Sequence, residues 1–530
     1  MKQILLVLAL LLGLFLRTYN LSNVPNGLTW DEAAIGYNAY SILKTGRDEH
    51  GVFLPLIFKS FGDYKPGLYI YLTVPSVAIF GLNEFAVRLP NAIFGVLTIY
   101  SLYLFLNLLL KNKKDNLLPV FASFALAVSP WAVHFSRGAW EVNVFVCLLL
   151  FALFFYLKFL KGQSSIFLSL VLASLTLVLY QAAKLLTPLL FLLLFLIFKK
   201  ESIQKISLLL TNKKNIFLLT PFFLFGLWLV FGVFFGQAGN RLATLSIFGY
   251  KPELANTYYE NQPLLTLNLV FSRFLYHFSP EILFYEGARI SERAHIPGAG
   301  LLSHLEFVPL ILGLFYLSKV FDKKTQKIVF GFLLLSPIPA SLTLAEYSPL
   351  RALFMTIPLS IISGTGFYYL YKKLRLAFLL FLPLYLIVAV YLFDLYFFHS
   401  GATFAAEFNT GHKEAITIIK NNPTAKVVFT DVYGQPYIYY LFYTGYDPKT
   451  YQKENNFTSG GLDVGKVGNV GNVFFHQFGS NELEYQKDVL FIGTEGNINR
   501  TFDIASDKVK LFKQIESPDK KIIFRAVITK

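Results

Sequence analysis

ILLVLALLLGLFL (residues 4–16) opens the chain, and GLTWDE (residues 27–32) follows it. Lys2 precedes the apolar run and no small-x-small cleavage site comes after it, so we predict an uncleaved first membrane span. Asp31 and Glu32 then stand next to Trp30 at the bilayer surface, where a membrane chain seldom keeps carboxylates without a function. This acidic pair is the starting point for interpreting the chain as an enzyme.

Composition predicts a membrane protein. The 530 residues are 55% hydrophobic and only 15% charged, against about 25% charged in soluble proteins, and the mean hydropathy is +0.53. The net charge of +15 does not indicate a nucleic-acid partner, because the lysines fall in short clusters between apolar runs, as the positive-inside rule requires. The single cysteine, Cys147, lies within an apolar run, where we expect it to pack.

The apolar runs alternate across a membrane if every basic loop is cytoplasmic. This arrangement predicts eleven spans, a cytoplasmic amino terminus and an extracytoplasmic carboxyl terminus. The predicted spans are 4–19, 85–110, 117–134, 141–160, 165–182, 184–198, 215–236, 300–318, 328–345, 350–371 and 376–397. Residues 1–397 are therefore predicted to form one transmembrane domain.

Three outer segments complete the predicted organisation. The first outer loop, about 20–84, contains two predicted surface helices, 33–43 and 68–82; the second includes Pro75 and is too short to span. The second segment is a long loop, about 237–299. The third, 398–530, is more polar and is predicted to be a small extracytoplasmic α/β domain. Its predicted elements are a helix at 412–420, strands at 426–430, 489–492, 509–513 and 521–527, and a helix or strand at 436–443.

Candidate reactive residues gather at the predicted outer turns. Transfer from a charged lipid needs a carboxylate to accept a proton and cations to hold phosphate. Each candidate has a structural alternative: the acidic pair could cap a helix, and the cations could anchor the chain at the interface. The candidate carboxylates are Asp31, Glu32 and Glu141, and the candidate cations are Lys65, Arg88, Arg137, Lys184, Arg289, Arg293 and Arg351.

The order of these motifs resembles a known family. Asp31-Glu32 in the first loop, Lys65-Pro66 before a surface helix and Phe85-Ala-Val-Arg-Leu-Pro90 at the second span are similar to the GT-C glycosyltransferases. The closest branch is the group of dolichyl-phosphate-mannose protein mannosyltransferases and lipid A aminoarabinose transferases. The resemblance covers roughly residues 1–397 and departs from the family at Gly67, where relatives often have a second proline.

The resemblance implies an inverting transfer of a sugar from a polyprenyl-phosphate donor to a glycan, lipid or protein hydroxyl, on the outer face of the plasma (inner) membrane. Asp31 matches the family's catalytic carboxylate and would be the general base; Glu32 would support it, and Glu141 matches a second acidic position. Lys65 and the arginines would stabilise the departing lipid phosphate. Some relatives bind a metal at this face, but we predict no metal or other cofactor because no ligand cluster has suitable spacing; a divalent metal stays an open alternative.

Two other functions stay open. A polytopic transporter or lipid-linked sugar flippase would place charges near the bilayer midplane, often in repeated halves, and the sequence shows neither feature. A receptor whose outer tail binds glycan or protein would leave the charged first loop without a purpose. The sequence does not identify the sugar or the acceptor.

Overall fold

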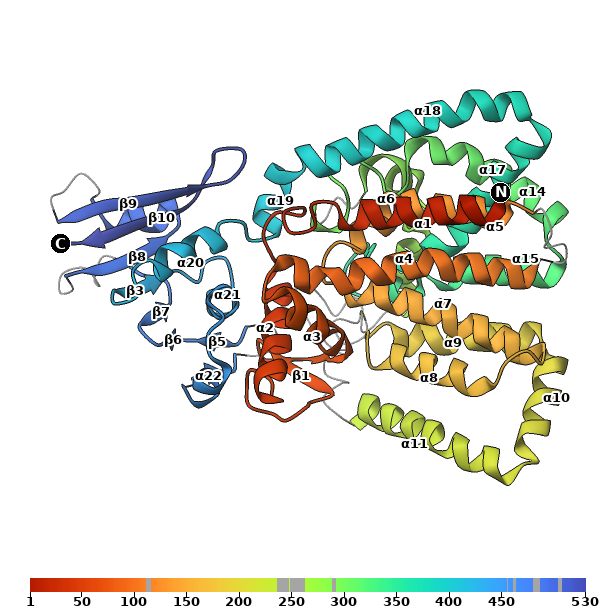
Figure 1. Cartoon of the computed structure of the whole chain (residues 1–530), viewed down its shortest axis with the longest axis horizontal. Helices are drawn as coiled ribbons and strands as arrows, with labels where there is room; N and C mark the ends of the chain where they lie inside the picture. The colour runs from red at the N-terminus through yellow and green to blue at the C-terminus, as the bar shows by residue number, and fades with distance from the viewer. Residues whose placement is uncertain are drawn as a thin grey trace. The chain divides into compact units, whose positions relative to one another are not determined.

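The computed structural model of the chain describes residues 1–110, 116–235, 247, 263–287, 292–454, 456–460, 464–479, 487–503 and 508–530. The chain divides into two compact units (Figure 1). Unit 1 consists of Met1–Tyr19 and Asn91–Tyr396, and unit 2 consists of Asn20–Pro90 and Phe397–Lys530. The long helix α4 (Glu84–Leu109) begins in unit 2 and continues into unit 1.

Unit 1 is built from apolar helices. Each of the eleven predicted spans contains helix, as expected for runs that must satisfy their backbone hydrogen bonds internally in lipid. Besides α4, the helices are α1 (Lys2–Thr18), α5 (Leu118–Val128), α6 (Pro130–Phe135), α7 (Glu141–Leu160), α8 (Ile166–Leu177), α9 (Ala183–Ile197), α10 (Lys199–Leu210), α11 (Lys213–Phe235), α13 (Pro263–Tyr276), η1 (Ile282–Glu286), η2 (Glu292–Ala294), η3 (His304–Glu306), α14 (Phe307–Val320), α15 (Lys323–Leu335), α16 (Ile338–Ser341), η4 (Leu353–Met355), α17 (Thr356–Lys373), α18 (Arg375–Asp394) and η5 (Leu395–His399).

Four helical stretches of the described chain are long and apolar enough to cross a membrane: Glu84–Leu109, Glu141–Leu160, Leu353–Lys373 and Arg375–His399. The chain is thus a multi-pass integral membrane protein, while the number of eleven spans stays a prediction. One predicted span, 117–134, is two helices, because Ser129 is extended and its side chain caps α6 in front of Pro130.

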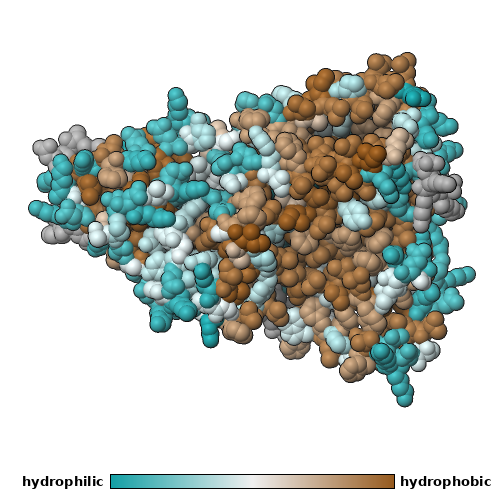
Figure 2. Space-filling view, viewed as in Figure 1, coloured by the Kyte–Doolittle hydropathy of each residue, from teal (hydrophilic) through white to brown (hydrophobic). Residues whose placement is uncertain are grey.

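The surface of unit 1 is also apolar. Helix α18 leaves Leu380, Ile387 and Val390 exposed by 65–70%, and side chains of this kind gather over the helices of unit 1 in Figure 2. A soluble protein rarely exposes so wide an apolar area. Such a surface is typical of a protein whose helices are in contact with lipid tails.

The tail part of unit 2 is a six-stranded sheet with helices. The strand order is β6-β7-β3-β8-β10-β9, in which β3 runs parallel to β7 and β8 while β10 is antiparallel to β8 and β9. The segment whose type was left open forms helix α21, which starts at Pro436 and ends before Gly445 in the left-handed conformation. The strands are β3 (Lys426–Phe429), β4 (Phe457–Thr458), β5 (Lys466–Val467), β6 (Asn469–Val470), β7 (Val473–Phe475), β8 (Val489–Gly493), β9 (Val509–Glu516) and β10 (Ile522–Thr529), and the helices are α19 (Gly401–Glu407), α20 (His412–Lys420), α21 (Pro436–Thr444), α22 (Pro448–Glu454) and α23 (Glu495–Thr501).

The first-loop part of unit 2 packs onto this tail. Helix α2 (Trp30–Thr45), predicted as an amphipathic surface helix at 33–43, instead buries ten of its sixteen residues and contacts α3 (Leu68–Phe80) and α21. Small residues allow this close approach: a Cβ at Gly36 would lie 2.4 Å from the Phe442 ring. Between α2 and α3, strands β1 (Ile57–Ser60) and β2 (Asp63–Pro66) form an antiparallel hairpin.

Candidate active site

A capping box positions the acidic pair at the start of α2. Thr29 is the N-cap: its Oγ1 accepts a hydrogen bond from the Glu32 amide at 3.2 Å, and its own amide donates to Glu32 Oε2 at 3.0 Å. The Thr-x-x-Glu spacing satisfies two amide donors at the helix end. Glu32 and Thr29 therefore cap the helix, which is the structural role considered for the acidic pair. Asp31 lies in the same first turn but is not part of this capping box.

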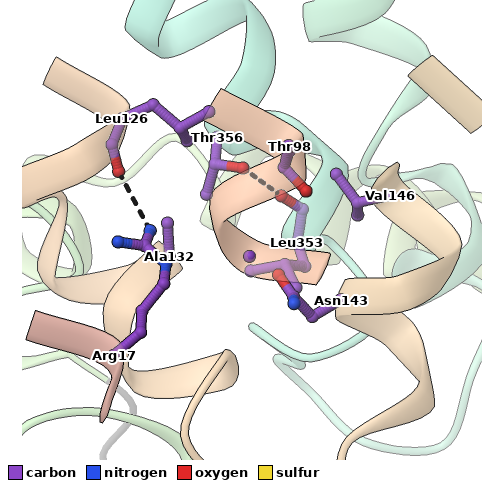
Figure 3. A pocket seen from close by; sticks show the side chains of 9 residues that line it. Arg17, Thr98, Leu126, Ala132, Asn143, Val146, Leu353 and Thr356 are labelled. Atoms are coloured by element: carbon purple, nitrogen blue, oxygen red, sulfur yellow. Dashed lines mark hydrogen bonds between the residues drawn. The ribbon is translucent and has the colours of Figure 1, made fainter. Parts of the chain in front are cut away.

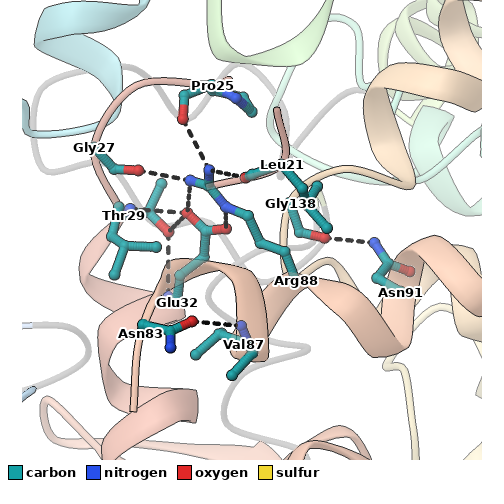
Figure 4. Close-up of polar contacts among 12 residues, drawn as sticks. Leu21, Pro25, Gly27, Thr29, Glu32, Asn83, Val87, Arg88, Asn91 and Gly138 are labelled. Atoms are coloured by element: carbon teal, nitrogen blue, oxygen red, sulfur yellow. Dashed lines mark hydrogen bonds and ion pairs between the residues drawn. The ribbon is translucent and has the colours of Figure 1, made fainter. Parts of the chain in front are cut away.

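Glu32 also forms a buried ion pair with Arg88 of α4 (Figure 4). Arg88 Nε and Nη2 donate to the two carboxylate oxygens of Glu32 at 2.9 and 3.2 Å. The remaining guanidinium hydrogens go to the carbonyls of Leu21, Pro25 and Gly27, at 2.6–3.1 Å. All five N–H donors of Arg88 are thus used within unit 2. Gly27 fits this loop because its φ is +84° and a Cβ would lie 2.2 Å from the Phe408 carbonyl oxygen.

Asp31 faces a different partner, Lys65. The β1–β2 hairpin presents Lys65, whose ammonium forms a salt bridge with Asp31 Oδ1. The Asp31 side chain is 45% exposed and the Lys65 side chain 17% exposed. The Lys65 ammonium also lies 5.2 Å from the centre of the Phe61 ring. Of the pair, Asp31 is the carboxylate that solvent or a substrate reaches.

A further carboxyl group of unit 2, that of Glu49, is fully buried and lies near Lys65. Asn38 of α2 holds it, since Asn38 Nδ2 donates to Glu49 Oε1 and the Glu49 amide donates to Asn38 Oδ1, both at 3.0 Å. Burial raises the pKa of Glu49 to about 8, and the nearby charge of Lys65 partly opposes this shift. Glu49 was not predicted, because no motif distinguishes it from the other acidic residues of the first outer loop, such as the neighbouring Asp48.

Two predicted cations of unit 1, Arg137 and Arg293, lie in one cluster of aromatic side chains and His134. His134 Nε2 donates to the Arg293 carbonyl oxygen at 2.8 Å, which leaves Nδ1 to accept from the Tyr396 hydroxyl at 3.2 Å. The Arg137 guanidinium lies 5.6 Å from the centre of the Tyr396 ring and donates to the Leu16 and Tyr19 carbonyls at the end of α1. The Arg293 guanidinium lies 5.7 Å from the Trp140 ring.

The other described candidates of unit 1 lie at or shortly before the starts of helices. Glu141 is the first residue of α7. Lys184, in the first turn of α9, donates to Gln181 Oε1 at 2.7 Å. Arg351 donates to Ser348 Oγ at 3.2 Å. Arg289 lies outside the described residues.

A further arginine, Arg17, was not predicted. It lines a small pocket in unit 1 together with Thr98, Asn143 and Thr356 (Figure 3). Its guanidinium donates to the Leu126 and Ala127 carbonyls at the carboxyl end of α5, where the helix dipole is negative. The sequence feature that could have identified Arg17 is its position as a lone arginine in the last turn of an apolar helix. In the part of the chain that is described, no group of three or more His, Cys, Asp or Glu residues could hold a metal ion.

The fold defines the class first: a multi-pass helical membrane protein whose fold is similar to that of solved ArnT structures. ArnT from Cupriavidus metallidurans in the apo state has a similar structure, with a TM-score of 0.54 and 12% identity over 99% of this chain and 97% of that one. The same protein bound to undecaprenyl phosphate gives a TM-score of 0.52, with the same identity and coverage.

A family model matches part of the sequence. Residues 64–225 match the family described as dolichyl-phosphate-mannose-protein mannosyltransferase. The predicted resemblance to this type of GT-C protein is thereby confirmed. No curated protein sequence matches the chain.

Proposed function

We propose that this chain is a glycosyltransferase that moves a sugar from a polyprenyl-phosphate donor to an acceptor hydroxyl, with inversion, on the extracytoplasmic face. The observation that carries the proposal is the division of labour in the acidic pair. Glu32 is buried and is bonded through both carboxylate oxygens, whereas Asp31 is half exposed beside a lysine. A hydroxyl becomes a good nucleophile only when such a group accepts its proton.

Lys65 has two roles in this mechanism. Its positive charge favours the ionised form of Asp31, the form that accepts a proton. Its second proposed role is to contact the phosphate of the lipid donor, because an ammonium group stabilises the negative charge that the phosphate gains as the sugar departs. In this proposal, Lys65 thus stabilises the negative charge of both the general base and the leaving phosphate.

Arg88 takes a different role from the one first predicted. With its five donors already used, it has none to offer to a phosphate in this structure. We assign it instead as a positioning residue, which fixes Glu32 and through it the first turn of α2 that carries Asp31. Glu32 likewise supports the site and does not itself react.

Within unit 2, we propose that Lys65 is the residue that binds the donor phosphate. For the cations of unit 1, binding of the lipid phosphate stays a prediction from the family resemblance, as does the role of Glu141 as a second acidic residue; these cations are Arg137, Lys184, Arg289, Arg293 and Arg351. That ArnT, which has this fold, was solved with undecaprenyl phosphate supports a polyprenyl phosphate as the donor carrier.

Labelled donors test the proposed function. The full-length protein in proteoliposomes is incubated with a panel of polyprenyl-phosphate sugars, each labelled in the sugar, and with membrane extract as the source of acceptor. We expect one donor to lose its label to a lipid, glycan or protein product. Label that crosses the bilayer while still attached to its polyprenyl phosphate would identify a flippase instead.

A further inference from the structure

A loop of the tail packs directly against the residue before Asp31. The Trp30 ring lies on Gly434, where a Cβ would be 2.6 Å from Trp30 Cζ3 and 2.7 Å from Cε3. Gly434 has a φ of +107°, so both its conformation and its surroundings favour glycine. Gly434 belongs to the loop 430–435 that leaves the carboxyl end of β3.

This loop is at the edge of the sheet where α/β domains usually bind ligands. Strands β3, β7 and β8 run parallel, so their carboxyl ends lie at one edge. Polar residues follow these strands: Thr430 and Asp431 come after β3, and Asn497 comes after β8, with its Oδ1 3.4 Å from Thr430 Oγ1.

A second tail segment reaches the same neighbourhood from the β1–β2 hairpin. The Gly465 amide donates to the carbonyl of Phe61, the residue whose ring lies under the Lys65 ammonium. The next residue, Lys466, forms an ion pair with Asp431 at 2.6 Å. Contacts thus lead from Trp30 through Gly434 to Asp431, and from Lys65 through Phe61 to Lys466. We call Trp30, Asp431, Gly434 and Lys466 the tail rim.

Asp431 has an unused acceptor. Its side chain is only 8% exposed, and Lys466 contacts one oxygen, Oδ2. The other oxygen, Oδ1, is buried and has no hydrogen-bond partner among the residues that the structure describes. A buried carboxylate oxygen without a donor is costly, so a ligand hydroxyl or an ordered water is expected there.

We propose that the tail rim binds the acceptor and that this acceptor is a carbohydrate. The inference rests on the proposed function and names its acceptor class. Sugar hydroxyls both donate and accept, and so match a carboxylate and an ammonium side by side. An aromatic ring such as Trp30 offers an apolar face to a sugar ring. A phosphorylated ligand fits less well, because Asp431 would repel it.

Glycan binding by the full-length protein in lipid nanodiscs tests this inference. The probes are an array of soluble hexose- and pentose-containing oligosaccharides and an array of peptides containing Ser and Thr. We expect the wild-type protein to retain at least one oligosaccharide, and Asp431→Asn and Lys466→Gln to weaken that binding by about tenfold or more. Asp519→Asn is the matched control, since Asp519 pairs with Lys521 at 2.8 Å in the turn between β9 and β10.

The other outcomes overturn the inference. Retention of no oligosaccharide, retention of peptides alone, or equal binding by Asp431→Asn would each contradict a carbohydrate site at the tail rim. If the melting temperatures of Asp431→Asn and Lys466→Gln equal that of the wild type, a loss of oligosaccharide binding is a local effect and not a result of unfolding. Consumption of labelled donor is followed in the same preparations: a donor consumed without glycan binding counts against this inference alone, and glycan binding without donor consumption counts against the proposed function alone.

Discussion

Asp31 and Glu32 are neighbours in one helical turn, yet their surroundings differ, and we have proposed a different role for each. Glu32 is enclosed by Arg88 and by the N-cap Thr29, while Asp31 is 45% exposed and pairs with Lys65. A buried ion pair is costly to break, and a half-exposed one is not. Substitution of the two partners therefore separates a structural role from a catalytic one.

Arg88→Met should destabilise the protein by about 3–5 kcal/mol, because it leaves Glu32 charged and buried without its partner. Thermal unfolding in detergent measures the loss, and Glu32→Gln combined with Arg88→Met should recover part of it. Lys65→Met should change stability by about 1 kcal/mol or less, while sugar transfer falls. Equal melting temperatures for Arg88→Met and wild type would refute the positioning role of Arg88.

The buried acid Glu49 predicts a pH dependence of stability. Its pKa rises from 4.5 to about 8 on folding, so the unfolded chain loses this proton first and the free energy of unfolding falls as pH increases through that range. Burial lowers the pKa of the adjacent His50 from 6.5 to about 4, so His50 no longer titrates in either state much above pH 6.5.

Between pH 6.5 and 8 we therefore expect wild-type stability to fall by about 2 kcal/mol and the stability of Glu49→Gln to fall less. Melting temperatures of both proteins at the two pH values check this difference. Parallel pH profiles for the two proteins would show that Glu49 is already ionised in the folded state.

At the scale of elements, the packing of α17 depends on two glycines that face different neighbours. A Cβ at Gly366 would lie 1.8 Å from the Pro309 carbonyl oxygen of α14, and one at Gly364 would lie 2.4 Å from the Ala122 amide nitrogen of α5. Small residues at such contacts let helix backbones approach closely in a membrane. Helix α17 is accordingly buried between α14 and α5.

Gly366→Ala should destabilise the protein by about 1–3 kcal/mol, since α14 and α17 must move apart. Gly226→Ala is the control: Gly226 lies in α11, and a Cβ added there would meet no described atom within 4 Å, so the change should be neutral or stabilising by up to about 1 kcal/mol. Thermal unfolding compares the two. A Gly366→Ala protein as stable as Gly226→Ala would disprove the close α14–α17 contact.

The sequence predicted which segments are helical better than where the helices break. Long apolar runs must form helices in lipid, and 141–160 coincides with α7. The division at Ser129-Pro130 was missed because apolar residues continue on both sides of it. The partners of Arg88 and the burial of Glu49 were also beyond prediction, since both depend on tertiary contacts between segments far apart in the chain. The pairing of Lys65 with Asp31 was not predicted either, because the family resemblance implied only that Lys65 would stabilise the lipid phosphate.

At the scale of the whole molecule, the charge pattern predicts eleven spans with the tail outside. This predicted orientation rests on the positive-inside rule. The buried Cys147 is the only cysteine of the chain, so a Cys147→Ala protein is a clean background for single cysteines.

In that background, Lys521→Cys should react with a membrane-impermeant maleimide added to intact cells, because Lys521 is in the exposed β9–β10 turn. Lys327→Cys, in a predicted cytoplasmic loop, should react only after the cells are opened. The reverse pattern, or labelling of both in intact cells, would overturn the predicted topology.

Sugar transfer by Asp31→Asn protein is the most direct test of the proposed catalysis. Asparagine keeps the shape of the side chain but cannot accept the proton, so kcat should fall by about 10²–10⁴-fold. The control Glu201→Gln, from a half-exposed pair with Lys324 at 2.5 Å, should transfer at the wild-type rate. Near-normal transfer by a folded, membrane-inserted Asp31→Asn protein would contradict the role of Asp31 as general base.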